Sequence, residues 1–297
     1  TPQEILDKGF VEAKNIVFSL AESESDGQLD GSVISGAFSL RGTNHSDTLI
    51  GNDESNSIFL LANTSSNVGG GEDTVSAGGG DDVIWLSPAV SGTSWSHIFS
   101  GYDSKTNSYL VSGAIDGGAG ADEFVVQHNQ WFYHAGGGRS YERSWGLDLT
   151  QLSMTNLEGL TFSNSHNSGL DHVIVSASQV ASLGSIAGAK LLILVGGGDI
   201  DLDHLASIGI TSWRIGDAQS YNITGTSASD VISVADGLSN IEAGAGNDTI
   251  NIDNASNPLN TISGGEGSDI LIVKGSDVDL SQATLSGIEE IRVSSQS

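Results

Sequence analysis

The chain of 297 residues contains no cysteine. Disulfide frameworks, thiolate zinc sites and cysteine nucleophiles are therefore excluded. Basic residues are also scarce, since 10 Lys and Arg face 37 Asp and Glu and leave a formal net charge of -27 at pH 7. Nucleic acid is not expected as a partner, because binding phosphate groups requires a basic surface. No apolar run approaches the ~20 residues of a membrane helix, so membrane insertion is not expected either.

The chain has only 3 Pro but 40 Gly. Much glycine with little proline argues against a disordered linker and favours many tight turns between short strands. A net charge of this size repels itself and disfavours a compact state. We therefore expect the fold to recruit cations, divalent metal first.

The abundant glycines belong to a nine-residue repeat, G-G-x-G-x-D-x-U-x, in which U is a large apolar residue. Copies begin at residues 225, 243 and 264, and others begin at 42, 68, 77 and 117. A degenerate copy begins at 51 and has Asn56 at the Asp position. The spacing from 225 to 243 is two nonapeptides, whereas the next copy is three residues late, which places an insertion near Asn257 and Pro258.

These repeats resemble the RTX (hemolysin-type calcium-binding) nonapeptide family. Glycines permit left-handed turns and leave backbone carbonyls unshielded, and each x-U-x triplet is a short strand with one inward apolar side chain. Two nonapeptides then make one turn of 18 residues that stacks on the next. The resemblance and the handedness rule for parallel crossovers imply an all-β, right-handed parallel β-solenoid (a β-roll or β-helix) with calcium-binding turns and loop insertions.

Calcium prefers carboxylate and carbonyl oxygens, which the stacked loops offer. The resemblance implies several Ca²⁺ ions, with ligands from the Asp at position six and from the carbonyls of positions one to four. It selects Asp230, Asp248 and Asp269 as one ladder, and Asp47, Asp73, Asp82 and Asp122 as single or partly stacked candidates. The residues expected to offer carbonyls in the C-terminal ladder are Gly225, Ser227, Ala243, Gly244, Ala245, Gly246, Gly265 and Gly267. The alternative that these are solvated turn aspartates remains open.

A longer repeat overlies the short one, because residues 147–162 align without gaps to residues 278–293. It pairs Asp148 with Asp279 and Glu158 with Glu289, and each copy follows a G-G-x-G-x-D loop. The first copy carries about 16 additional residues, roughly 130–145. We therefore expect two solenoid modules, residues 1–162 with an aromatic-rich insertion at about 86–146, and residues 163–297 ending in the calcium ladder.

The segment between the two copies lacks glycine loops. It predicts a strand at 172–175, a short capped helix at 176–183 and a buried strand at 191–195. Residues 199–203 alternate Asp with apolar residues, which predicts three carboxylates on one strand face. An EF-hand loop is rejected there, because His204 stands where the glycine belongs and Ile210 where the glutamate belongs. The order of these elements resembles segments of very large type I-secreted adhesins.

Catalytic motifs are not found: the chain has neither H-E-x-x-H nor G-x-S-x-G, and its seven histidines are scattered. No catalytic residue is assigned and an enzyme is not expected, although paired carboxylates acting on a polysaccharide stay open. Eight of the ten Trp and Tyr residues lie between Trp85 and Trp145. They either present flat faces to sugar rings or seal a flank of the solenoid. The candidate ligand-binding residues are Trp95, Tyr102, Tyr109, Trp131, Tyr133, Arg139, Tyr141 and Trp145.

Two functions follow from these patterns. The first is a secreted, extracellular calcium-binding structural or adhesive module of a bacterial surface layer or large adhesin at the cell surface, which folds on calcium after type I secretion. The second is a polysaccharide-binding or polysaccharide-modifying module that uses the aromatic insertion. The expected partners are calcium together with a cell-surface polysaccharide or copies of the chain itself.

Overall fold

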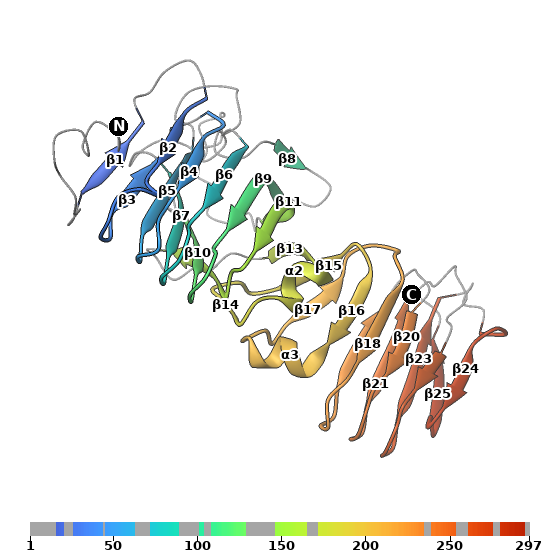
Figure 1. Ribbon diagram of the computed structural model, residues 1–297. Helices are drawn as coiled ribbons and strands as arrows, with labels where there is room; N and C mark the ends of the chain where they lie inside the picture. The colour runs from blue at the N-terminus through green and yellow to red at the C-terminus, as the bar shows by residue number, and fades with distance from the viewer. Residues whose placement is uncertain are drawn as a thin grey trace. The chain divides into compact units, whose positions relative to one another are not determined.

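A computed structural model describes residues 16–20, 26–43, 45–62, 72–88, 101–103, 108–128, 146–164, 172–234, 239–253, 261–275 and 280–294 (Figure 1). The chain divides into two compact units. The first comprises residues 1–173 and 182–190, and the second comprises residues 174–181 and 191–297. The module boundary expected after residue 162 stays a prediction.

The strands of the first unit alternate between two sheets. One sheet contains, in spatial order, β1 (Val17–Ser19), β3 (Ser39–Arg41), β5 (Ser57–Ala62), β7 (Val83–Pro88), β10 (Glu123–His128), β12 (Gly159–Asn164) and β14 (Ser185–Ala187). The other contains β2 (Gln28–Asp30), β4 (Thr48–Ile50), β6 (Asp73–Ser76), β9 (Ser108–Asp116) and β11 (Gly146–Thr155). The short β8 (Gly101–Asp103) lies antiparallel to β9, whereas the neighbours within the two sheets run parallel wherever their register is described. β13 (His172–Ser176) begins in the first unit and ends in the second.

The second unit repeats the same plan after a short helical region. It begins with α2 (Ala177–Ala181), β15 (Leu192–Val195), β16 (Gly198–Asp201), α3 (Leu202–Ser207) and β17 (Trp213–Ile215), which pairs with β15. One sheet continues from β16 through β18 (Tyr221–Thr224), β20 (Ser239–Glu242), β22 (Thr261–Ser263) and β24 (Thr284–Ser286). The facing sheet contains β19 (Val231–Val234), β21 (Thr249–Asp253), β23 (Ile270–Lys274) and β25 (Glu290–Ser294).

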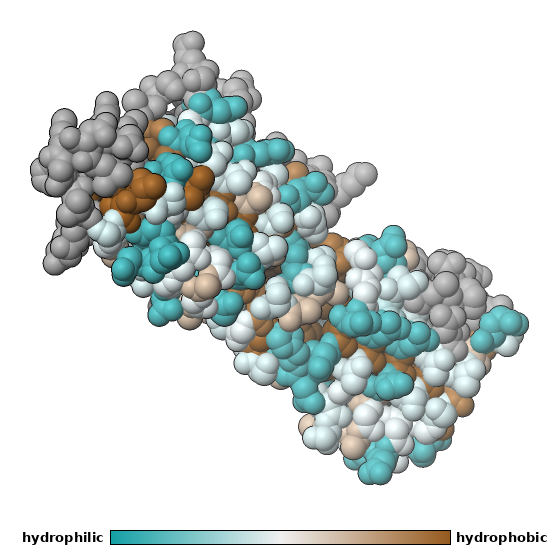
Figure 2. Space-filling model, in the orientation of Figure 1, coloured by the Kyte–Doolittle hydropathy of each residue, from teal (hydrophilic) through white to brown (hydrophobic). Residues whose placement is uncertain are grey.

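In both units, successive strands apart from β8 alternate between sheets, and the strands whose pairing with the next turn is described lie parallel to it. This is the topology of a parallel β-solenoid, and the predicted all-β solenoid class is confirmed. Within the described residues, neither helix is long and apolar enough to cross a membrane. On the face in Figure 2, hydrophilic side chains cover much of both units, as the acidic composition requires.

The apolar residue of each x-U-x triplet forms a buried column. Ile232 pairs with Ile250, and Ile250 pairs with Leu271, and all three are 0% exposed. Burying a side chain of this size contributes roughly 1.5–3 kcal/mol. The column keeps its register although one turn is 18 residues long and the next is 21, so the three additional residues do not shift the pairing of the strands.

Most of the region between the two copies of the longer repeat follows the prediction. β13, α2 and β15 confirm the expected strand, short helix and buried strand. The predicted strand over residues 199–203 is wrong at its end. The Asp201 carboxylate accepts the His204 N–H at 3.2 Å and caps α3, so Asp203 lies in the first helical turn and the three carboxylates do not share a strand face.

Candidate metal centre

The three C-terminal glycine loops stack so that their aspartates touch. Oδ1 of Asp248 accepts the backbone N–H of Asp230 at 2.8 Å, and Oδ1 of Asp269 accepts the N–H of Asp248 at 2.8 Å. The structure thus joins the three aspartates selected from the sequence into one continuous row. Each strand that follows the row begins directly after its aspartate, because the buried x-U-x column sets the loop spacing.

Glycine is required at positions two and four of the loops that begin at residues 243 and 264, for two reasons. Gly265 and Gly267 have φ angles of 102° and 140°, in the left-handed region that side chains disfavour. A Cβ atom at either position would overlap a carbonyl oxygen of the loop stacked against it, that of Gly244 or Gly246. The loops therefore stack backbone on backbone, with their carbonyl groups close to the aspartate row.

In the aspartates that follow the first loop of a row, one oxygen of the carboxylate has no hydrogen bond among the described residues. Oδ2 of Asp248 and Oδ2 of Asp269 are buried and lack a hydrogen bond among the described residues, and the same holds for Asp82 and Asp122 in the first unit. These four residues are at most 1% exposed. Leaving such an oxygen unpaired costs about 1–3 kcal/mol, and more when it is charged. A hard cation bound to these oxygens would remove that cost, so the residues fit the calcium that the sequence implies.

The first unit contains two further rows. The Asp47 N–H donates to Oδ1 of Asp73 at 2.9 Å. In the other row, the Asn56 N–H donates to Asp82 at 2.6 Å, and the Asp82 N–H donates to Asp122 at 2.8 Å. The candidates expected to be single or partly stacked are therefore all stacked, and the degenerate copy with Asn56 is a full member of its row.

Burial opposes the negative charge of four carboxylates in these rows, Asp73, Asp82, Asp122 and Asp248. It raises the pKa of Asp82 to about 7, with the nearby charges of Asp122 and Asp81 adding to the effect and the Asn56 N–H opposing it. Burial likewise raises the pKa of Asp73 to about 7. The pKa values of Asp122 and Asp248 are raised by the same cause. A bound cation would offset both the desolvation and the mutual repulsion.

The first loop of a row differs from the inner loops. In the C-terminal row, Thr226 donates its N–H at 2.6 Å and its hydroxyl at 3.0 Å to Oδ2 of Asp230. Thr43 makes the same two hydrogen bonds to Oδ2 of Asp47. Both threonines stand at position two, where the inner loops have glycine. Consequently Asp230 and Asp47 are satisfied within their own loops, whereas Asp248 and Asp269 are not.

Backbone carbonyl oxygens are available as ligands beside the carboxylates of these rows. Among the residues that the structure describes, no three His, Cys, Asp or Glu side chains gather closely enough to hold an ion by themselves. The rows instead offer carboxylates one loop apart, with loop carbonyls between them. The residues expected from the sequence to offer carbonyls all lie in these stacked loops: Gly225, Ser227, Ala243, Gly244, Ala245, Gly246, Gly265 and Gly267.

Comparison with known families agrees with this geometry. The family model of the RTX calcium-binding nonapeptide repeat matches in four copies, over residues 67–87, 224–254 and 260–274. These segments of the chain are RTX calcium-binding repeats. The matched RTX segments contain the whole C-terminal row, together with Asp73 and Asp82. The copies beginning at 42, 51 and 117 lie outside the matched segments and rest on sequence pattern and stacking. No match is found among curated proteins or among solved structures.

The aromatic candidates cannot be placed with the RTX rows. Tyr102 and Tyr109 are backbone partners across the antiparallel β8–β9 pair. The other six candidates lie outside the described residues: Trp95, Trp131, Tyr133, Arg139, Tyr141 and Trp145.

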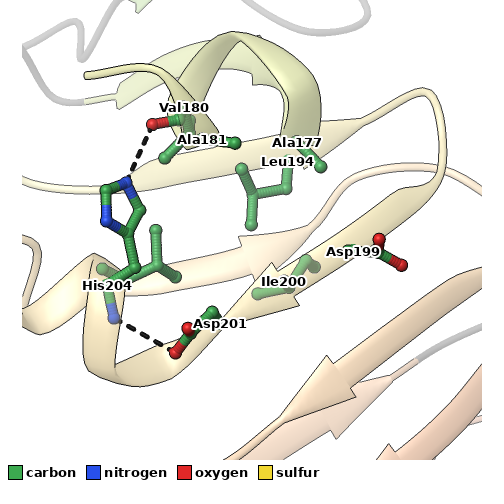
Figure 3. Close-up of a pocket in the computed structure, with 9 residues that line it drawn as sticks. Ala177, Val180, Ala181, Leu194, Asp199, Ile200, Asp201 and His204 are labelled. Carbon is green, nitrogen blue, oxygen red and sulfur yellow. Dashed lines mark hydrogen bonds between the residues drawn. The ribbon is translucent and has the colours of Figure 1, made fainter.

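The second unit also holds a cavity of about 290 Å³, drawn in Figure 3. Its lining combines apolar side chains of α2, β15 and α3 with Asp199, Asp201 and His204. Nε2 of His204 lies 3.1 Å from the Val180 carbonyl oxygen, and Asp199 accepts a hydrogen bond from Asn222 at 2.7 Å. The imidazole is thus held by a backbone carbonyl, and these contacts describe structural roles for both polar groups.

Proposed function

We propose that this RTX chain is an extracellular, calcium-dependent structural or adhesive module of a bacterial surface layer or large adhesin. One observation carries the calcium dependence: four buried aspartates in stacked glycine loops each have a carboxylate oxygen with no hydrogen bond to the part of the chain that the structure describes. Such oxygens destabilise the metal-free fold, and calcium supplies the positive charge that they lack. The matched repeats are calcium-binding repeats, and the extracellular location agrees with their chemistry.

The proposed sites couple calcium concentration to folding. An ion bound only by the folded state stabilises it by RT ln(1 + [L]/Kd). For extracellular-type sites with Kd of roughly 10⁻⁴ M, about 10 mM calcium contributes about 2.7 kcal/mol per site. At the sub-micromolar calcium of a cell interior, this contribution is close to zero. The acidic chain would therefore stay loosely folded before export and form its solenoid afterwards.

Calcium-dependent folding can be measured directly. Far-ultraviolet circular dichroism and thermal melting are recorded on the whole chain in excess chelator, in millimolar calcium, and in millimolar magnesium as the ionic-strength control. We expect β-structure and a cooperative melt in calcium, and less β-structure with a lower melting temperature in chelator. Identical spectra and melting temperatures in chelator and calcium would contradict the proposal.

A second function, polysaccharide binding, is supported by the concentration of eight of ten Trp and Tyr residues between Trp85 and Trp145. Aromatic rings stack on sugar rings. A glycan array probed in calcium, with the wild type beside a Trp131→Ala and Tyr133→Ala double variant, tests it. Binding to one sugar class that the double variant loses supports this function, and an array without binding contradicts it. Filaments or sheets seen by negative-stain microscopy on calcium addition support the structural role instead.

A further inference from the structure

Two aspartate rows end in a turn that the nonapeptide pattern does not include. Residues 156–158 follow the row of Asp82 and Asp122, and residues 287–289 follow the row of Asp248 and Asp269. Each of these closing turns ends in glutamate, Glu158 or Glu289, and the next residue starts β12 or β25. A full loop places its carboxylate at position six, so the closing turns are three residues shorter.

The backbone of a closing turn starts as a full loop does. The Gly264 N–H donates to the carbonyl of Ser286 at 2.9 Å, as the Ala243 N–H donates to that of Ser263 at 2.9 Å one turn earlier. Gly287 then adopts a left-handed φ of 57°, and a Cβ atom at Gly264 would overlap its carbonyl oxygen. The first carbonyl of the closing turn therefore packs against the last full loop.

The other closing turn is built in the same way. Asn156 has a φ of 50°, the one left-handed residue other than glycine among the described residues. The Gly117 N–H donates to the Thr155 carbonyl at 3.0 Å, and a Cβ atom at Gly117 would overlap the Asn156 carbonyl oxygen. Two separate places in the chain thus share one local design.

The glutamates take the place that an aspartate has in the row. Oε2 of Glu289 accepts the Asp269 N–H at 2.7 Å, and Oε2 of Glu158 accepts the Asp122 N–H at 2.8 Å. These bonds match the one from the Asp248 N–H to Asp269. The additional methylene of glutamate lets a shorter turn reach the same N–H.

The glutamates also stop the row. The Glu289 N–H returns to the Asp269 carbonyl at 3.1 Å, and the Glu158 N–H returns to the Asp122 carbonyl at 3.0 Å. In the row itself, the corresponding N–H of each aspartate donates to the next carboxylate instead. Neither glutamate therefore offers its N–H to a further member.

We infer that each closing turn completes a divalent-cation site with the loop before it, formed by Asp122 with Glu158 and by Asp269 with Glu289. Oδ2 of Asp122 and Oδ2 of Asp269 are buried and have no hydrogen-bond partner within the described ranges, and these residues are 1% and 0% exposed. The glutamate adds a second carboxylate and the turn adds the carbonyl of Asn156 or Gly287. A closing turn lacks positions four to six and its glutamate is exposed. Such a site has fewer protein ligands than one between two full loops, and it binds calcium more weakly. The inference rests on the proposed calcium binding.

Calcium binding is counted by equilibrium dialysis of the chelator-stripped whole chain for the wild type, E158Q, E289Q and the double variant. Glutamine still accepts the N–H, so the hydrogen bond is kept while the charge is lost. We expect each single variant to lose one ion from the weakest class, or to bind it at least tenfold more weakly, and the double variant to lose two. The matched control E290Q removes a charge one residue away, from an exposed pair with Arg292, and should bind as the wild type does.

The outcomes separate the two claims. A wild type that binds no calcium overturns the proposed function itself. A wild type that binds calcium, with E158Q and E289Q indistinguishable from it, overturns only the closing-turn sites. Anomalous diffraction from wild-type crystals grown in calcium needs no variant: a peak about 2.3–2.6 Å from oxygens of both Asp269 and Glu289 supports the inference. Peaks at Asp248 with none at Glu289 overturn it.

Discussion

Asp269 uses its two carboxylate oxygens in different ways. Oδ1 accepts the backbone N–H of Asp248 at 2.8 Å, whereas Oδ2 is buried without a hydrogen bond among the described residues. The first bond ties one turn of the solenoid to the next. The second oxygen is left for a ligand, so the same side chain links stacking to metal binding.

Members of one row should contribute unequally to calcium binding. We expect Asp248→Asn or Asp269→Asn to lower calcium affinity at least tenfold, because each removes the charge of a buried carboxylate whose Oδ2 has no hydrogen bond among the described residues. Asp230→Asn should have a much smaller effect, because Thr226 already occupies Oδ2 of Asp230. Isothermal titration calorimetry of the three variants measures the difference, and equal losses in all three would contradict it.

Without metal, the protein should become less stable as pH rises from about 4 to about 7. Burial raises the pKa of Asp73 and Asp82 from 3.8 to about 7, so the folded state binds more protons than the unfolded state across this window. Stability from protonation is complete below the unfolded pKa and is lost as pH passes the folded pKa.

Calcium should reverse this pH dependence, because a cation competes with the protons and its stabilisation grows as the carboxylates ionise. Urea unfolding at pH 5 and pH 7.5, in chelator and in calcium, measures both slopes. Asp82→Asn should flatten the slope in chelator. A metal-free stability that rises between pH 5 and pH 7.5 would contradict the burial argument.

Glycine at position two should be far less replaceable than glycine at position three. Gly78 has a φ of 109° and a Cβ atom there would overlap the Asn52 carbonyl, so Gly78→Ala should cost at least about 1–3 kcal/mol. The matched control Gly79→Ala adds the same methyl group at a position where the loop stacked on it has Ala119. Urea unfolding in saturating calcium compares the two variants. Similar losses in the free energy of unfolding would show that the close approach of the stacked loops is not what requires glycine at position two.

The buried column should dominate stability once calcium is bound. Ile250→Ala should lower the free energy of unfolding by about 2–5 kcal/mol, because the residue is fully buried between Ile232 and Leu271. Val231, next to Ile232 but 68% exposed, provides the control, and Val231→Ala should change the free energy by about 0.5 kcal/mol or less. Comparable losses in chemical denaturation would argue against the column as the core.

Local chemistry made the fold and the aspartate rows predictable. Glycines at fixed positions, an aspartate at position six and one inward apolar residue already specify a turn, a ligand and a strand within nine residues. The spacing between Asp230 and Asp248 therefore predicted their stacking correctly. The strand predicted over residues 199–203 failed where Asp201 caps a helix, since a short alternating run does not separate a strand from a helix start.

What the tertiary structure alone decided is which neighbour each residue meets one turn away. Glu158 and Glu289 were already paired by the longer repeat, yet their place at the end of a row emerged only when Asp122 and Asp269 were seen to donate to them. Likewise, Asp230 and Asp248 have the same motif position, but Oδ2 of Asp230 accepts a hydrogen bond from Thr226 whereas Oδ2 of Asp248 has none among the described residues. The sequence determines the conformation of each glycine loop, because the interactions that form the loop lie within one nonapeptide. The stacking of the turns determines the candidate metal site, because the oxygens of that site come from different turns.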